Sequence, residues 1–463
     1  MSSDGLRLSV EKMRAAGVHE TAIDTFAHYY ERLVAGETGL LPESEIEPLR
    51  DVADFDALEG QAGSQLIDEA VVIKVNGGLG TSMGMTRAKS LLEVKDGLSF
   101  LDVTARQVLG VRRRTGARLP LVLMNSFATQ ADSRRALARH EGLAADVPAD
   151  FLQNKEPKIR ADDLTPVEWP ANPDLEWAPP GHGDLYTALV TSGLLPRLLE
   201  HGYRYAFVSN SDNLGATFDP RILQWFASRG LPYASEVCDR TEADKKGGHL
   251  ARLRDGGGLV LRETAQTPDE DVAAFQDVER HPYFNCNNLW MDLQALSAVL
   301  EARDGVLGLP MIVNRKTVDP GDKTTPAVIQ LESAMGAAIA VFDGAEALRV
   351  PRSRFAPVKT TSDLLVLRSD AYELTPESEV RLAPAREGRV PIAALDDDYF
   401  KLVRDFDARV PAGAPSLVAC DRLTVRGDVT FGAGVVCRGT VEVDGPLQVE
   451  DGAVLEGAAQ GAA

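Results

Sequence analysis

The chain has 463 residues, of which 44% are hydrophobic and 25% are charged, and it carries a formal net charge of −20. This length predicts two or three domains, and the composition is typical of a soluble globular protein. The negative charge disfavours nucleic acid or an anionic membrane as a partner, because such binding depends on Lys and Arg side chains that face phosphates. No apolar run approaches the roughly 20 residues of a membrane-spanning helix, and the first residues lack a secretory signal, so we expect a cytoplasmic protein.

The cysteines are widely spaced and form no C-x-x-C pair; they are Cys238, Cys286, Cys420 and Cys437. This spacing indicates neither a disulfide framework nor a zinc site. We expect four reduced thiols.

Hydrophobic periodicity predicts the following elements in chain order. Residues 1–60 show helical spacing, for example Ile23, Phe26 and Tyr30, and predict an N-terminal helical segment. The second domain is expected to span residues 61–380, and from about residue 70 to 235 short apolar stretches, expected as strands, alternate with amphipathic stretches, expected as helices. The strands are 71–75, 119–124 and 205–209, and the helices are 101–114, 130–140, 185–201 and 219–228. This alternation predicts an α/β domain with a mixed, mainly parallel sheet. Residues 249–263 alternate around Asp-Gly-Gly-Gly and predict a hairpin.

The tail differs in kind. Residues 381–415 are rich in proline and charge and are expected to form a connector. In residues 416–463, β-branched side chains recur in short stretches separated by Gly or Asp-Gly. This pattern favours a short C-terminal parallel β-helix, with a small sandwich as the alternative. Such coils leave an open end, which could bind a second copy of the chain in a homo-oligomer or serve as a capping module.

A glycine-dense segment directly follows the strand at 71–75. It contains Gly77, Gly78, Gly80 and Gly84, and Lys89 comes next. Glycines allow positive φ and a close approach of the backbone, so several N–H groups can point at one phosphate. The spacing excludes a Walker loop, because Lys89 does not follow a glycine, and it excludes a dinucleotide fingerprint, because Met83 stands at the third glycine position. A tight turn without a ligand is the alternative.

The order Gly-Gly-x-Gly-Thr-x-Met-Gly, then Lys-Ser, resembles the signature of sugar-nucleotide pyrophosphorylases. Further blocks follow in order at residues 124–127, 179–184, 209–215, 239–248, 284–290, 328–332 and 350–364. Together they resemble the eukaryotic-type UDP-glucose pyrophosphorylase (UTP:glucose-1-phosphate uridylyltransferase) family, from about residue 70 to the tail. The resemblance implies a Rossmann-like nucleotidyltransferase (GT-A-like) domain. It also implies a reversible, Mg²⁺-dependent reaction of UTP with glucose 1-phosphate that gives UDP-glucose and pyrophosphate.

The resemblance also assigns residues. It implies catalytic roles for Lys89, Lys359 and Asp212, with Asp212 as the Mg²⁺ ligand. It implies nucleotide contacts at Val75, Asn76, Gly77, Gly78, Lys89, Gln153, Gly181, Asp212 and Lys359. The sugar phosphate would meet His182, Asn210, Asn287 and Glu332, although the choice among Asn285, Asn287 and Asn288 stays open.

The residue types fit these roles. A carboxylate at a strand end can bind a hard cation that phosphates complete, and a glutamine amide matches the uracil edge. The attacking group is a phosphate monoester, largely dianionic at neutral pH, so no general base is required. Catalysis would consist of alignment and charge neutralisation.

The sequence departs from the family pattern at the two residues before Lys89. Arg87 and Ala88 occupy positions where the family more typically has Gly and Pro. Arg87 adds a charge that we expect to reach the UTP phosphates. Two other functions compete: a uridylyltransferase for galactose 1-phosphate or N-acetylhexosamine 1-phosphate, and a non-catalytic sugar-nucleotide sensor.

Overall fold

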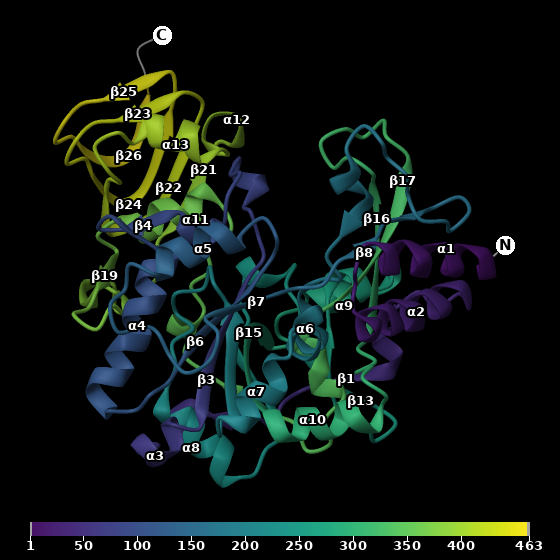
Figure 1. Cartoon of the computed structure of the whole chain (residues 1–463). Helices are drawn as coiled ribbons and strands as arrows, with labels where there is room; N and C mark the ends of the chain where they lie inside the picture. The colour runs from purple at the N-terminus through teal and green to yellow at the C-terminus, as the bar shows by residue number, and fades with distance from the viewer. Residues whose placement is uncertain (1, 461–463) are drawn as a thin grey trace.

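A central mixed sheet organises the molecule, with the C-terminal strands at one end and the N-terminal helices at the other (Figure 1). The structure, a computed structural model, describes residues 2–460. The strand order is β2-β18-β12-β15-β11-β3-β6-β7. These strands are β2 (Ala53–Asp54), β18 (Glu346–Arg349), β12 (Tyr233–Asp239), β15 (Tyr283–Asp292), β11 (Tyr205–Asn210), β3 (Ala70–Asn76), β6 (Leu121–Asn125) and β7 (Asp150–Leu152). A branch of the same sheet contains β1 (Ile46–Pro48), β13 (His249–Leu253) and β14 (Leu259–Arg262).

The sheet is mixed, as predicted, but its antiparallel part is larger than the strand–helix alternation indicated. Strands β11, β3, β6 and β7 are parallel neighbours. Strand β15 follows the β13–β14 hairpin in the chain. It lies between β11 and β12 and is antiparallel to both. The hairpin itself is confirmed.

Apolar side chains of β3 alternate between the two faces of the sheet. Val71 and Ile73 pack in one core with α6 (Leu185–Thr191), α7 (Leu194–Glu200) and α10 (Leu293–Ala302). Ala70 and Val72 pack in the other with α4 (Phe100–Thr115), α5 (Gln130–Leu137) and α8 (Pro220–Ser228). Burial on both faces explains the continuous apolar run of this strand. Since β3, β6 and β11 are parallel, the loops after them meet at one edge of the sheet.

Two expectations about local structure were wrong. The helix expected over 185–201 is two helices, α6 and α7, because Gly193 takes a left-handed φ of 70° between them. The helices of residues 1–60 are α1 (Ser2–Ala15) and α2 (Glu20–Val34), but residues 46–54 contribute β1 and β2, which pair with β13 and β18. Strands this short carry no readable alternation, and their partners are remote in sequence.

The N-terminal helices pack on a separate three-stranded sheet. Met13, Phe26 and Tyr30 share a core with β16 (Met311–Thr317), β17 (Ala327–Ser333) and β9 (Ile159–Arg160). The smaller elements are β8 (Glu156–Pro157) with β10 (Trp177–Ala178), β4 (Glu93–Lys95) with β5 (Leu98–Ser99), β19 (Tyr372–Leu374) with β20 (Val380–Leu382), and helices α3 (Ser64–Ile67) and α9 (Val272–Gln276).

The C-terminal strands are parallel and lie in two sheets. One contains β21 (Ile392–Leu395), β22 (Ser416–Arg426), β24 (Val436–Asp444) and β26 (Val454–Gln460), and the other β23 (Val429–Phe431) and β25 (Leu447–Val449). Strand β21 lies in the segment expected as a connector, 381–415, which also holds α12 (Asp397–Phe400) and α13 (Val403–Arg409). The C-terminal strands share one core with α11 (Thr361–Arg368) and with Met83 of the glycine-rich loop. None of the helices within residues 2–460 has the length and apolar character needed to cross a membrane.

Candidate functional site

The glycine-rich loop leaves the end of β3 and turns back on itself. Gly80 and Gly84 take left-handed φ values of 66° and 73°, which favour glycine. The backbone N–H of Lys89 donates to the carbonyl of Gly78 at 3.0 Å and closes the loop. A side chain at Gly77 would place its Cβ 2.6 Å from Oε1 of Gln153, so Gln153 lies directly against the loop.

The ammonium of Lys89 connects the loop to two other segments. Nζ pairs with Oδ2 of Asp212 at 2.8 Å and donates to the carbonyl of Val358 at 2.5 Å. Asp212 lies in the turn after β11, and the N–H of Val358 donates to its carbonyl at 3.4 Å. Lys359 follows Val358 directly, and its side chain is exposed. The structure therefore brings Gly78, Lys89, Asp212 and Lys359 to one edge of the sheet.

His182 is held in one orientation by a contact with the segment after β17. Its Nδ1 accepts the backbone N–H of Met335 at 2.9 Å, which leaves Nε2 to carry the proton in the neutral ring. Burial lowers the pKa of His182, so the ring is neutral at pH 7. Gly181 has φ 78°, and a Cβ there would lie 2.6 Å from the carbonyl oxygen of Ser333. A neutral ring that carries its proton on Nε2 can donate to an anionic oxygen.

The structure narrows the choice among the asparagines of β15. Asn288 is fully buried, and its Nδ2 donates to Glu236 at 2.9 Å and to the carbonyl of Arg354 at 3.3 Å. Asn287 has a left-handed φ of 58° and a partly exposed side chain, and its N–H donates to Oδ1 of Asn285 at 3.1 Å. Asn288 is therefore occupied inside the protein, whereas the side chain of Asn287 is partly exposed and accepts only a long hydrogen bond of 3.5 Å from Nδ2 of Asn285.

The remaining predicted residues differ in their surroundings. Asn76 donates to Oδ1 of Asn125 at 2.7 Å and to Oγ of Ser133 at 2.8 Å, so its side chain joins β3 to β6 and α5. Val75 and Asn210 lie at the ends of the neighbouring strands β3 and β11, opposite each other in register. Glu332 of β17 pairs with Lys316 at 3.3 Å.

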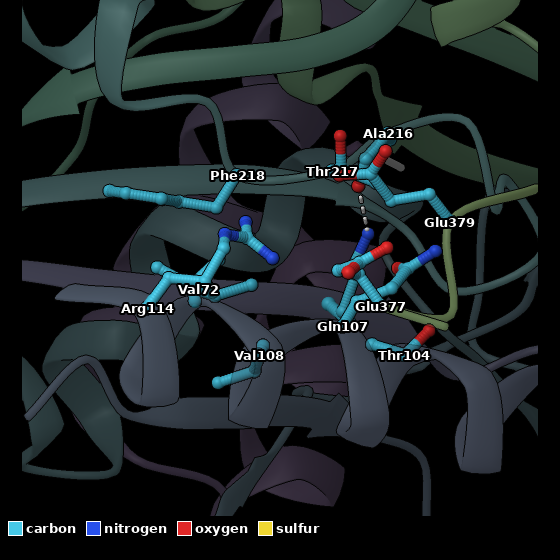
Figure 2. A pocket seen from close by; sticks show the side chains of 12 residues that line it. Val72, Thr104, Gln107, Val108, Arg114, Ala216, Thr217, Phe218, Glu377 and Glu379 are labelled. Atoms are coloured by element: carbon cyan, nitrogen blue, oxygen red, sulfur yellow. Dashed lines mark hydrogen bonds between the residues drawn. The ribbon is translucent and has the colours of Figure 1, made fainter. Parts of the chain in front are cut away.

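A cavity of about 600 Å³ lies on the Gln153 side of the loop, lined among others by Phe127, Leu152 and Lys155. A second, much smaller cavity of about 20 Å³ lies between α4 and the sheet, where Gln107, Thr217 and Glu377 line it (Figure 2). That volume suits a single water molecule rather than a nucleotide.

Sequence reasoning missed Glu263 at the end of β14. Burial raises the pKa of this carboxyl to about 7, and the charge of Lys359 opposes that rise. Its Oε2 would lie 2.7 Å from a Cβ at Gly248, so it packs against the loop 246–248. No local sequence signal marks this residue, because only the hairpin's position brings it near Lys359.

Sequence reasoning also missed Lys74 in β3. Its Nζ donates to Oγ of Ser209 at 2.6 Å and to the carbonyl of Ala216 at 2.8 Å, and burial lowers its pKa to about 7. A single lysine in an apolar strand is the only signal that could have indicated it.

Comparison with known proteins decides the family. Residues 23–438 match the family model described as UTP–glucose-1-phosphate uridylyltransferase. The chain belongs to this family.

Similar proteins match along nearly the whole chain. The UTP–glucose-1-phosphate uridylyltransferase of Hordeum vulgare is 40% identical over 465 residues, which cover 98% of this chain and 95% of that protein. The protein of that name from Saccharomyces cerevisiae is 41% identical over 395 residues, covering 84% of this chain and 77% of the yeast protein. Among solved structures, a mutant UDP-glucose pyrophosphorylase from Leishmania major in complex with UDP-glucose superposes with a TM-score of 0.93 at 45% identity, covering 99% of both chains.

Proposed function

We propose that this protein transfers a uridylyl group from UTP to glucose 1-phosphate and releases pyrophosphate. The observation that carries the proposal is the convergence of the glycine-rich loop, Lys89, Asp212 and Lys359 at one sheet edge. The names of the family and of its relatives in barley and yeast support the same activity.

The reaction is an in-line displacement. A phosphate oxygen of glucose 1-phosphate attacks the α-phosphorus of UTP, and the bond from that phosphorus to the bridging oxygen of pyrophosphate breaks. The nucleophile is already largely dianionic at pH 7, so no residue has to remove a proton. The protein has to hold two anions together and neutralise the charge that develops on the leaving group.

The chain's own groups can do this. The N–H groups of the loop 77–84 bind phosphate oxygens, and Lys89 and Lys359 supply two positive charges. His182 donates from Nε2 to an oxygen of the sugar phosphate, because its Nδ1 is already engaged with Met335. Gln153 reads the uracil edge from its place against Gly77.

Mg²⁺ is the proposed cofactor, with Asp212 as its ligand. Within residues 2–460, no group of three or more His, Cys, Asp or Glu side chains could hold a metal ion. Asp212 uses Oδ2 for Lys89, and its Oδ1 makes no hydrogen bond to the described part of the chain. One free carboxylate oxygen fits Mg²⁺, which takes one or two carboxylates and completes its shell with phosphate oxygens and water. When bound, the ion supplies positive charge at the transferring phosphate.

The sugar side of the site is proposed to consist of Asn210, Asn287 and Glu332, with Glu263 close to Lys359. These side chains carry amide and carboxylate groups that can bond hexose hydroxyls.

We further propose a Rossmann-like, GT-A-like catalytic domain and a C-terminal parallel β-helix that joins two copies of the chain. Parallel pairing of β22, β24 and β26 in register supports the β-helix. Strand β26 is the last of its sheet, its outer edge has no strand partner within residues 2–460, and Val454 on it is 53% exposed. The molar mass measured by light scattering at micromolar protein concentration tests whether two copies associate, and the mass of a monomer would refute the proposed dimer.

One assay tests the reaction. The purified protein is incubated with UTP, Mg²⁺ and, separately, the 1-phosphates of glucose, galactose and N-acetylglucosamine, and pyrophosphate release is measured. We expect the highest kcat/KM with glucose 1-phosphate. A higher value with another sugar would change the substrate, and no release with any sugar would favour the sugar-nucleotide sensor.

A further inference from the structure

A buried ion pair lies beside the loop that carries Asp212. Arg354 donates from Nε and Nη2 to the two carboxylate oxygens of Glu236, at 2.8 and 2.6 Å. Their side chains are 6% and 0% exposed. Trp290 and Asn288 each donate a further hydrogen bond of 2.9 Å to the same carboxylate. Buried charges are tolerated when their hydrogen bonds are satisfied in this way, and a buried ion pair is by itself weak evidence for stability.

Asn213, the residue after Asp212, connects this pair to the site. Its Nδ2 donates to the carbonyl of Arg354 and to Oδ1 of Asn288, both at 3.2 Å. Its Oδ1 accepts the N–H of Ala356 at 2.9 Å. Both ends of one amide thus join the turn after β11 to the segment that leads to Lys359.

Further contacts hold the same two segments together. Nη2 of Arg354 donates to the carbonyl of Thr217 at 2.9 Å, and Asn213 forms a β-bridge with Pro357. At Gly215 a Cβ would collide with the carbonyl oxygen of Ser353, so the backbones touch. The segments 209–217 and 353–359 therefore form one unit.

This unit sets the relative position of two charges. Asp212 lies on the first segment and Lys359 on the second, and the side chain of Lys359 makes no hydrogen bond or ion pair with the rest of residues 2–460. The backbone of its segment therefore fixes where the side chain begins and so which region its ammonium can reach. That backbone is fixed to the Asp212 turn through Asn213 and Arg354.

We propose that Asn213 and Arg354 are positioning residues, which fix Lys359 relative to Asp212 so that both charges act on one phosphate. The proposal rests on the proposed function. Both side chains are buried and engaged with the protein, so each acts through the segment it holds rather than through a contact with substrate. A displacement of about 1 Å at a reacting group can cost on the order of 10² in rate, so loss of this link should lower kcat.

The test compares steady-state kinetics of Asn213→Ala and Arg354→Lys with the unmodified enzyme. Lysine keeps the charge but lacks the planar guanidinium that bonds the two oxygens of Glu236 in parallel, and Asn213→Ala leaves no charge without a partner. We expect kcat to fall by about 10- to 100-fold with each, while KM for UTP and for glucose 1-phosphate changes by less than about threefold. Arg349→Lys is the matched control, because Arg349 also bonds both oxygens of a carboxylate, that of Asp239, but on the surface. It should retain the unmodified kcat.

Double variants separate positioning from a general loss of structure. If Asn213 and Arg354 act through Lys359, adding either substitution to Lys359→Ala should lower kcat by less than about threefold beyond Lys359→Ala alone. Losses that multiply in full would overturn the proposal, as would an unchanged kcat or a change confined to KM.

If Arg354→Lys does not fold, Asn213→Ala decides, with its folded fraction confirmed by circular dichroism. An unmodified enzyme without pyrophosphate release would refute the proposed function itself, whereas an active enzyme with fully active variants would refute only the positioning role.

Discussion

Replacing Lys359 by alanine tests directly whether its positive charge contributes to catalysis, because this side chain makes no contact within residues 2–460 that stabilises the fold. Only its backbone N–H is engaged, with Oδ2 of Asp363 at 2.8 Å, and alanine keeps that bond. The side chain is exposed, and within residues 2–460 it has no hydrogen-bond or ion-pair partner. The free energy of unfolding should therefore change by no more than about 0.5 kcal/mol.

The effect on rate should be much larger. One preorganised group that stabilises developing charge contributes about 10²- to 10³-fold to kcat, or roughly 2.7–4 kcal/mol. Lys89 cannot replace Lys359, because its ammonium is already held by Asp212 and by the carbonyl of Val358. We therefore expect Lys359→Ala to lower kcat by at least about 10²-fold.

The assay is pyrophosphate release at saturating UTP, Mg²⁺ and glucose 1-phosphate, with thermal unfolding measured on the same preparation. Lys323→Ala, at an exposed lysine in the turn after β16, is the matched control and should keep full activity. Unchanged turnover in Lys359→Ala would remove this lysine from the mechanism. A large loss of thermal stability would show that the lysine supports the fold, contrary to the structure.

Three further predictions concern other residues. Arg87 is exposed beside the loop, so Arg87→Gly should raise KM for UTP, and an unaltered KM would show that Arg87 faces solvent only. Because burial raises the pKa of Glu263 to about 7 from 4.5, the native state binds the proton more tightly than the unfolded state. Its contribution to stability is thus complete below pH 4.5 and is lost as the pH rises to 7, by roughly 3 kcal/mol at about 1.4 kcal/mol per pKa unit. Urea unfolding of Glu263→Gln should lack this decline, and an equal decline in both proteins would contradict the assigned pKa. Gly181→Ala should lower both thermal stability and kcat/KM, because φ is 78° and the new Cβ would lie 2.6 Å from the carbonyl oxygen of Ser333; a variant that matches the unmodified enzyme in both would show that the backbone relaxes there.

Local sequence was sufficient for the elements with strong local signals. The run 71–75 followed by glycines predicted β3 and its loop, because a strand buried on both faces is continuously apolar and the turn needs positive φ at Gly80 and Gly84. The hairpin at 249–263 was likewise readable from alternation around a glycine turn. The family resemblance added the site residues, and the fold places Gly78, Lys89, Asp212 and Lys359 together.

Tertiary structure alone decided the features that depend on pairing between remote segments. Strands β1 and β2 exist because β13 and β18 supply their hydrogen bonds, and nothing in their few residues announces this. Asn288 was distinguished from Asn287 by its hydrogen bonds to Glu236, Arg354 and Asn213, which come from other segments of the chain. Glu263 acquires its raised pKa from burial, which a sequence does not display. Periodicity and glycine report on a residue's own backbone, whereas burial, charge pairing and the position of Lys359 are set by neighbours that only the folded chain brings together.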